Sequence, residues 1–296
     1  MGKTNCYSGS FGKIEAYKVG RSPFAKNPLK LPELPVTYGL SYPIMQTQPT
    51  LQLEDVIDDR LEMQRLHPQL FDDYLATGWR LLGNSLVRHN FSVCRRQMCR
   101  AIPLRIRLDG FICSKSQRQL LRRNAGLDVR CGPIHLTDEK TTLFDRHCER
   151  FEDRRPMSIR SFLGPEAHRE PVPGQEFCIY IDGMLAACSF IHLGQEGVSG
   201  TYCFFAPEYQ AYGLGNYTML LEILESQRLG KRYYYHGYCN DVPSGFDYKL
   251  NFNHLEALDW NTGLWNPQAR QSVRRWADLV EEENDQLNWQ PNAKGQ

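Results

Sequence analysis

The sequence lacks long apolar runs, closely paired cysteines and a large net charge. No hydrophobic stretch in its 296 residues approaches the length that spans a bilayer, and the opening MGKTNCYSGS lacks the apolar core of a secretory signal. We therefore expect a cytoplasmic protein that does not bind membranes. The formal net charge of only +1 argues against indiscriminate coating of nucleic acid.

Ten cysteines are present, but none forms a Cys-x2-Cys pair. Structural zinc sites normally contain such a pair, so we predict no metal and no cofactor. The nearest approach to a ligand set in the sequence is Cys94, Cys99, Cys113, Cys131 and Cys148 with His147. A chain of this length without the dense cysteine pattern of small secreted domains is expected to hold reduced thiols.

Positive charge is concentrated between Arg88 and Arg130. This segment holds eleven basic and two acidic residues, a net charge of +9, so the remainder of the chain carries −8. An acidic run lies near the C-terminus (Glu281, Glu282, Glu283 and Asp285). Such asymmetry favours a polyanion site on one surface, and a merely solvated basic face is the alternative.

The sequence SKSQRQLLRRN predicts a short helix within this basic segment. Ser114 and Gln117 have the spacing of a capping box, and Gly126 is the predicted stop. At 100° per residue the cations Lys115, Arg118 and Arg122 share one stripe, opposite Leu120 and Leu121.

The preceding PLRIRLDGFI (103–112) alternates apolar and polar residues, as a half-buried strand does. Its polar face contributes Arg105 and Arg107. Together with the helix, and with Arg123 at the helix end, these arginines predict a basic wall with spacing suited to phosphates.

The chain divides into five predicted segments. Residues 1–50 are proline-rich and expected to be extended; 51–137 form an N-terminal subdomain with the basic strand and helix. Residues 138–173 are charged and loop-like, as in a linker or insertion. A core segment spans 174–262, and a C-terminal helix with the acidic tail spans 263–296. Helical spacing of Leu53, Val56, Ile57 and Leu61 predicts a helix that Pro68 interrupts.

The core segment predicts the order of elements found in acetyltransferase-like (GNAT) folds. A hairpin over 177–191 turns at Asp182-Gly183, a strand covers 198–209, and a strand covers 232–238. Between the last two lies a helix over 213–230, with Tyr217, Leu220, Leu221 and Leu224 on one face and Gly230 ending it. The fold class is therefore α/β (α+β), a mixed sheet flanked by helices. In such folds the turn containing Gly213 and Gly215 aims backbone N–H groups at an anionic ligand.

Several linked motifs resemble the arginyl-tRNA–protein transferase family, including its bacterial leucyl-transferring branch. They are GWRLLG (78–83), AIPLRIRLDGFICSKSQRQLLRRN (101–124), FFAPEYQAYGLGNYTMLLEI (204–223), YYYHGY (233–238) and DYKLNF (247–252). The resemblance implies a GNAT-type catalytic domain with aminoacyl-tRNA as donor, here predicted to be Arg-tRNA. It implies an N-terminal Asp or Glu of a protein as acceptor, and it assigns tRNA binding to the basic wall.

Aminolysis of the aminoacyl ester requires positioning of two substrates, a proton acceptor and stabilisation of an oxyanion. We expect main-chain groups around residues 202–205 to form the oxyanion hole. Glu208 is predicted to sense the donor side chain or a cationic amine, and His236 to accept a proton. Tyr202, Tyr212 and Tyr217 are predicted to orient the ester or stack on the terminal adenine, although a structural role is open for each tyrosine and for His236. The family motif implies that Tyr248 and Lys249 bind substrate, with Lys249 contacting phosphate or carboxylate.

Two further functions remain open at the level of sequence. Paired N-terminal cysteines common in the family are absent, and DVPSGFDYK (241–249) departs from the family pattern while keeping Tyr248 and Lys249. These departures lie where acceptor choice should reside. They motivate a synthase that joins arginine to a free amino acid or small molecule, as in a cyclodipeptide. A tRNA-binding module without catalysis is the third hypothesis.

Overall fold

The computed structural model describes residues 56–94, 97–151, 155–270 and 273. The predicted extended segment 1–50, residue 53 of the predicted helix and the acidic run at 281–285 lie outside the described residues. In chain order the elements are β1 (Asp58–Glu62), α1 (Pro68–Ala76), β2 (Arg80–Leu82), β3 (Ser85–His89), β4 (Phe91–Cys94), β5 (Gln97–Arg107), α2 (Lys115–Arg123), β6 (Asp128–Pro133), α3 (Asp138–Cys148), η2 (Ile159–Ser161), β7 (Gly174–Ile181), β8 (Met184–Leu193), β9 (Gly197–Phe205), η3 (Pro207–Tyr212), α4 (Leu214–Arg228), β10 (Tyr233–Asn240), η4 (Asp247–Asn251), β11 (Leu255–Leu258) and β12 (Trp265–Asn266).

A nine-stranded mixed sheet organises the described fold, in the order β12-β11-β5-β10-β9-β8-β7-β6, with β4 paired to β5. Strands β9 and β10 run parallel, and α4 connects them. The other pairings in this sheet are antiparallel. The mixed α/β architecture predicted from the sequence is confirmed. The sheet takes β5 and β6 from the predicted N-terminal subdomain, so strands from both sides of the predicted linker share it; the division into domains stays a prediction.

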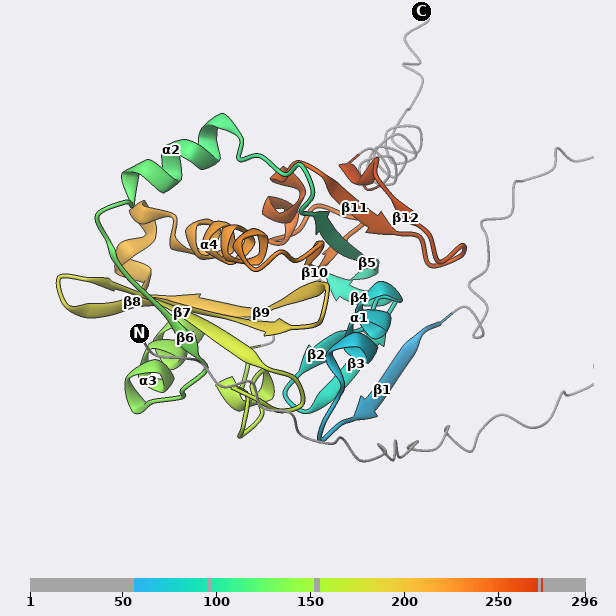
Figure 1. The fold of residues 1–296 in the computed structure, drawn as a ribbon, viewed down its shortest axis with the longest axis horizontal. Coiled ribbons are helices and arrows are strands. Elements are labelled where there is room, and N and C mark those ends of the chain that lie inside the picture. Colours follow the sequence, from blue (N-terminus) through green and yellow to red (C-terminus); the bar gives the residue numbers. More distant parts are fainter. Residues whose placement is uncertain (1–55, 95–96, 152–154, 271–272, 274–296) are drawn as a thin grey trace, which may run out of the picture.

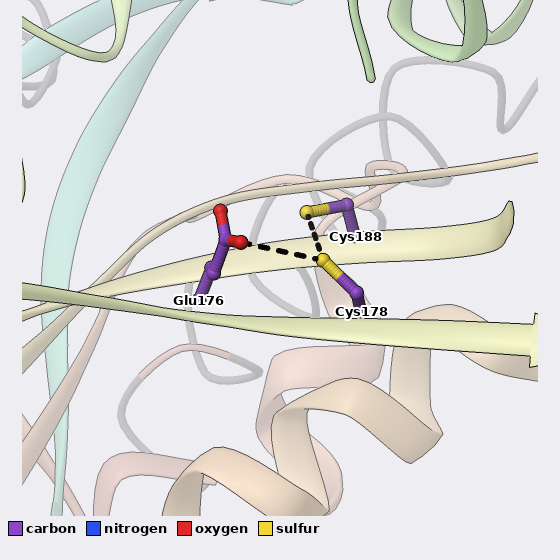
Figure 2. Close-up of side chains that lie close together, drawn as sticks. All are labelled: Glu176, Cys178 and Cys188. Carbon is purple, nitrogen blue, oxygen red and sulfur yellow. Dashed lines mark hydrogen bonds between the residues drawn. The ribbon is translucent and has the colours of Figure 1, made fainter. Parts of the chain in front are cut away.

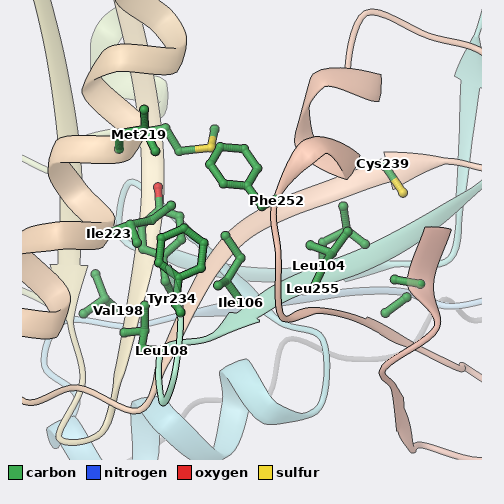
Figure 3. Close-up of a cluster of buried hydrophobic side chains, with 14 of the residues drawn as sticks. Leu104, Ile106, Leu108, Val198, Met219, Ile223, Tyr234, Cys239, Phe252 and Leu255 are labelled. Carbon is green, nitrogen blue, oxygen red and sulfur yellow. The ribbon is translucent and has the colours of Figure 1, made fainter. Parts of the chain in front are cut away.

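Helices α2 and α4 cover one face of the large sheet, and α3 covers the other (Figure 1). The main core lies between α4 and the sheet, where Ile106, Val198, Ile223 and Tyr234 pack together (Figure 3). A second cluster lies under α3 around Phe144 and Phe190. Burial of this apolar surface from both faces is the main contribution to stability of the sheet.

Local chemistry in the sequence predicts several elements correctly. Ser114 and Gln117 form the capping box that begins α2. The hairpin between β7 and β8 turns at Asp182-Gly183, with φ of 50° and 78° respectively, the left-handed pair that a two-residue turn of this kind requires. Helix α4 ends just before Gly230, whose φ is 70°.

Tertiary contacts overturn four local predictions. Val56, Ile57 and Leu61 do not lie on a helix: β1 occupies 58–62 because it pairs antiparallel with β3, and Pro68 begins helix α1 rather than interrupting one. The predicted loop over 138–173 contains α3, which packs its apolar face under the sheet.

The other two corrections concern the ends and faces of helices. Asn124, fully buried, caps α2 two residues before the predicted stop at Gly126, because its amide donates to the Tyr212 carbonyl at 2.9 Å. Leu224 of α4 is 38% exposed, whereas Thr218 and Glu222 of the same helix are buried. The buried face of α4 is therefore partly polar.

Candidate active site

The parallel strands β9 and β10 separate soon after they pair. Their pairing runs from Gly197 opposite Tyr233 to Ser199 opposite Tyr235, and goes no further. A register shift between Tyr235 and Gly237 bends β10 at this point. A cavity of about 830 Å³ opens where the strands diverge, with walls from β2, α3, β9, α4, β10 and η4. Divergence of strands at the start of a crossover helix is the kind of place where α/β proteins bind ligands.

The N-terminus of α4 opens onto this cavity. Gly213 adopts the left-handed conformation with φ of 64°, and no side chain caps the first turn of α4. Gly213, Gly215 and Asn216 all line the cavity wall. The uncapped N–H groups and the positive end of the helix dipole therefore lie beside the cavity, as the glycine motif predicts.

Arg80 of β2 is the first of three cations in the cavity wall. Its guanidinium donates to the carbonyls of Gly200 and Thr201 at 3.3 and 3.4 Å, beside the Tyr238 ring. Its Nε has no hydrogen-bond partner among the described residues. Burial lowers the pKa of Arg80, and no carboxylate offsets that effect. A guanidinium held this way is suited to binding an anion.

Lys249 of η4 is the second cation and is 7% exposed. Its Nζ donates to the Tyr238 carbonyl at 3.0 Å and lies 4.8 Å from the centre of the Phe246 ring. Burial, with the nearby Arg80 charge, lowers the pKa of Lys249 to about 7. Arg150, exposed at the end of α3, is the third cation in the wall.

Glu222 of α4 is the one carboxylate among the described residues that line the cavity. The Tyr234 hydroxyl donates to its Oε2. Burial raises the pKa of Glu222 to about 7, against the opposing effect of its hydrogen bonds. It is therefore a carboxylate able to exchange a proton near neutral pH.

His236 and Tyr202 lie in the cavity wall as predicted, in environments that limit their chemistry. Burial and the Lys249 charge lower the pKa of His236 to about 3, and its Nε2 donates to the Lys249 carbonyl at 3.2 Å. The remaining Nδ1 has no partner in the described structure. Tyr202 stacks on Phe162 with ring centres 3.9 Å apart, and burial raises the pKa of its hydroxyl.

Three predicted site residues lie elsewhere. Glu208 is exposed on η3, pairs with Arg146 at 2.7 Å and does not line the cavity, so the structure does not bring it to the site and its role in sensing the substrate stays a prediction. Tyr217 is buried in the core under α2 and donates to the Asn124 carbonyl at 3.2 Å. Tyr212 packs edge-on against Tyr209 and does not line the cavity. The sequence position of these residues near the glycine turn does not determine the direction of their side chains.

One of the main-chain groups predicted to form the oxyanion hole is already hydrogen-bonded within the protein. His147 Nδ1 lies 3.0 Å from both the amide nitrogen and the carbonyl oxygen of Phe205. The main chain of Phe205 is therefore held by His147. The positive groups that remain directed at the cavity are Arg80, Lys249 and the first turn of α4.

Helix α2 presents the predicted cationic face. Its exposed cations are Lys115, Arg118, Arg122 and Arg123. Arg123 also donates to the Tyr212 carbonyl at 3.0 Å, which ties α2 to the turn before α4. Arg107 at the end of β5 is exposed as well.

Arg105 does not belong to this face. Its Nε lies 2.7 Å from Glu256 in an ion pair whose side chains are 12% and 11% exposed, and its guanidinium packs on the rings of Tyr233 and Trp265. Because its charge is paired inside the structure, Arg105 lies apart from the exposed cations of α2, and the prediction that it binds tRNA stays untested.

A second, polar hollow of about 450 Å³ joins α2 to the cavity. Ser114, Ser116 and Gln117 of α2 line one side, and Asn251, Asn253 and Arg270 line the other. Asn216 and Tyr248 line both the hollow and the larger cavity. The cationic helix, the hollow and the cavity are therefore contiguous.

A separate buried cluster holds the one group of potential metal ligands in the described part of the chain: Glu176, Cys178 and Cys188 on β7 and β8 (Figure 2). The two sulfur atoms are 3.5 Å apart. Lys140 of α3 already pairs with Glu176 at 2.5 Å. The absence of a metal stays a prediction. Cys99 is disulfide-bonded, so the expectation of reduced thiols is wrong there, whereas Cys178 and Cys188 are free.

Sequence reasoning missed Arg80 and Glu222. Arg80 lies in the quoted GWRLLG motif, where no role was assigned to it. Glu222 gives a signal in hindsight: Leu214, Thr218 and Glu222 are spaced four residues apart on one helix face, and a carboxylate on a buried face is rarely there for packing.

Comparisons with known proteins show which family has sequences similar to this chain. A family model described as "Arginine-tRNA-protein transferase, C terminus" matches residues 139–259. An aspartate/glutamate leucyltransferase of Gluconacetobacter diazotrophicus is 31% identical over 187 residues, covering 62% of this chain and 68% of the relative. The enzyme of the same name from Xylella fastidiosa is 29% identical over 203 residues, covering 64% and 76%. That from Campylobacter jejuni is 23% identical over 206 residues, covering 68% and 84%.

Among solved structures, similarity is lower. L-PGS from Bacillus licheniformis aligns with a TM-score of 0.39 and 12% identity, covering 63% of this chain and 53% of that one. FemX aligns with a TM-score of 0.40 and 9% identity, covering 64% and 65%.

Proposed function

We propose that this protein moves an aminoacyl group from tRNA to the α-amine of an N-terminal Asp or Glu. The chain belongs to the arginine-tRNA–protein transferase family and is an aminoacyltransferase. The observation that carries this proposal is the cavity at the divergence of β9 and β10, which holds three cations and lies next to a cationic helix. A protein of this family needs both a surface that binds RNA and a cavity that holds the aminoacyl ester and the acceptor amine.

The donor side of the proposal uses α2. Lys115, Arg118 and Arg122 contact the phosphates near the tRNA acceptor end, with Arg107 and Arg123 adding charge at the edges. The polar hollow receives the terminal nucleotides, and the ester then reaches the cavity past Asn216 and Tyr248. The contiguity of these three features supports this path.

The acceptor side uses the cations of the cavity. Arg80 and Lys249 have no ion-pair partner within the described residues, so an anion entering the cavity would meet two uncompensated positive groups. The side-chain carboxylate of an N-terminal Asp or Glu is such an anion. The relatives are named aspartate/glutamate leucyltransferases, which agrees with this choice of acceptor.

For the aminoacyl group we propose a neutral, apolar side chain such as that of leucine. Aromatic and aliphatic residues form much of the wall, among them Phe151, Phe162, Phe205, Leu214 and Met219. Arginine, the cargo predicted from the sequence, would meet three cations and only one carboxylate there. Glu222 is the specific observation that favours arginine, since a guanidinium could pair with it.

The reaction proposed is aminolysis. The acceptor amine forms a bond to the carbonyl carbon, and the bond from that carbon to the ribose oxygen breaks. The developing oxyanion would be stabilised by the N–H groups at the start of α4. Positioning of two substrates supplies most of the acceleration for an ester that is already activated.

The test is transfer of labelled amino acid from purified Leu-tRNA or Arg-tRNA. The acceptors are a peptide with N-terminal Asp, the same peptide with N-terminal Ala, and a mixture of free amino acids. Label from Leu-tRNA in the Asp peptide alone is the expected result. Label from Arg-tRNA would restore the arginine prediction, and label in a small product would replace the protein acceptor by a free amino acid. Binding of charged tRNA without transfer would overturn the enzymatic proposal.

No helix among the described residues is long and apolar enough to cross a membrane. A cytoplasmic location, where charged tRNA is available, is part of the same proposal.

A further inference from the structure

The buried carboxylate of Glu222 has no structural partner that requires its charge. It lies in the middle of α4, is 4% exposed, and forms no ion pair within the described part of the chain. Its polar neighbours are neutral hydroxyls: Tyr234 donates to Oε2, and Ser189 lowers the pKa of Glu222 as Tyr234 does. A glutamine or leucine would satisfy a purely packing role at lower free energy, because an isolated buried carboxylate is costly to ionise.

The surrounding backbone leaves room for this pair. A β-carbon at Gly200 of β9 would lie 2.5 Å from the Tyr234 hydroxyl oxygen and 3.4 Å from Glu222 Oε2. Gly200, Tyr234 and Glu222 all line the cavity. The absent side chain at position 200 therefore lets the Tyr234–Glu222 pair face the cavity directly.

Several titratable groups line the cavity together with Glu222, among them His147 of α3, Arg150 just after α3, and Tyr202 of β9. Cys203 on β9, His236 on β10, Tyr248 on η4 and Lys249 on η4 line the same cavity, as does Arg80 on β2. Burial raises the pKa of Cys203 and of Tyr248 to about 12, so both are neutral at physiological pH. The pKa of His236 lies near 3, so it too is neutral.

We propose that Glu222 is the general base that removes a proton from the acceptor ammonium, and that Tyr234 positions it; this inference rests on the proposed transferase function. The ammonium loses one proton to Glu222 Oε1, and the free amine attacks the ester carbonyl. The second proton of the new amide nitrogen passes to the departing ribose oxygen. The proton on Glu222 then leaves to solvent, which balances the step.

The environment of Glu222 suits that role. An α-ammonium has an ordinary pKa of about 7.7–8.0, and a base whose pKa lies close below this accepts its proton with little loss of free energy. Burial brings the pKa of Glu222 to about 7. Lys249 of η4 and Arg80 of β2 line the same cavity as Glu222 of α4, so an acceptor whose carboxylate they hold would have its amine within this cavity.

The decisive variant is Glu222→Gln, which keeps the shape of the side chain and removes its basicity. We expect kcat for the Asp peptide to fall at least a hundredfold, with the KM for aminoacyl-tRNA unchanged. The rise of kcat near pH 7 in the wild-type protein should disappear. Glu225→Gln, on the same helix but paired with Arg228 outside the cavity, is the matched control and should behave as wild type.

Hydroxylamine separates a base from a structural residue, because it is a nucleophile that is already unprotonated at neutral pH. Glu222→Gln should retain most of its enzyme-dependent formation of aminoacyl hydroxamate, whereas misplacement of the ester would abolish both reactions. Tyr234→Phe should retain hydroxamate formation too and show a shifted pH profile with the peptide. Equal loss with both nucleophiles, or full peptide transfer by Glu222→Gln, overturns the inference. Absence of transfer by the wild-type protein instead refutes the proposed function.

Discussion

The guanidinium of Arg80 lies against the backbone of Gly237, where a β-carbon would come within 2.7 Å of the central guanidinium carbon. Gly237 has a φ of 88° and sits at the register shift of β10. Both the bend in β10 that opens the cavity and the position of the Arg80 guanidinium in the cavity wall therefore depend on Gly237.

Substitution Gly237→Ala is expected to displace Arg80 and weaken the acceptor site. The left-handed backbone also disfavours alanine, so the free energy of unfolding should fall by about 2 kcal/mol. Chemical denaturation measures the stability, and transfer to the Asp peptide measures the site. Gly183→Ala, at the hairpin turn with open space around it, is the control: it carries the backbone strain and should leave transfer intact. Full transfer by Gly237→Ala would remove Arg80 from acceptor binding.

Substitution Lys249→Gln tests the charge beside Arg80. The KM for an Asp peptide should rise about tenfold, because one charge-assisted hydrogen bond to the carboxylate is lost. Since burial lowers the pKa of Lys249 to about 7, its charge is present below that pH and lost above it. Acceptor binding by the wild-type protein should therefore weaken as the pH rises through 7.

The matching measurement is KM against pH for both proteins. In Lys249→Gln this pH dependence should vanish, with the KM for aminoacyl-tRNA unchanged. A tRNA-specific defect would instead assign Lys249 to the donor.

Charge reversal on α2 tests whether this helix binds tRNA. The double variant Lys115→Glu with Arg118→Glu should weaken tRNA binding and reduce the slope of log affinity against log salt by about one per lost phosphate contact. Arg65→Glu with Arg169→Glu is the matched control, because both arginines are exposed and contact Glu170 away from α2. Equal effects of the two double variants would mean that only net charge matters.

The free energy of unfolding should depend on pH through the Glu222 carboxylate, so it tests the raised pKa of Glu222 independently of activity. The pKa of Glu222 is about 7 in the folded state, against an ordinary value of 4.5, because burial disfavours the charged carboxylate, so the folded state binds its proton more tightly. Its contribution is thus lost as the pH rises from about 4.5 to 7. Glu222→Gln should therefore stabilise the fold above pH 7 by at most about 3 kcal/mol and change little at pH 4.

Thermal unfolding of wild type, Glu222→Gln and Glu225→Gln across this pH range is the measurement. A stabilisation that does not depend on pH would show that folding leaves the pKa of Glu222 unchanged, which would contradict its raised pKa.

Much of this protein follows from local sequence. The capping box at Ser114, the turn at Asp182-Gly183 and the glycine at 213 act through hydrogen bonds and backbone angles of a few neighbouring residues, so they are readable without the fold. The alternation of Leu104 and Ile106 against Arg105 likewise identifies a strand, because one face must be buried.

The direction of each side chain and the partner of each charged group are determined only by the tertiary structure. Arg105 and Arg118 look alike in sequence, yet one is buried with Glu256 and the other is exposed on α2. Glu208 and Glu222 are both acidic residues near the glycine motif, yet only the second faces the cavity. The reason is physical: whether a charge is exposed, paired or desolvated depends on residues that the fold brings together, 151 positions apart for Arg105 and Glu256 and 62 apart for Arg146 and Glu208.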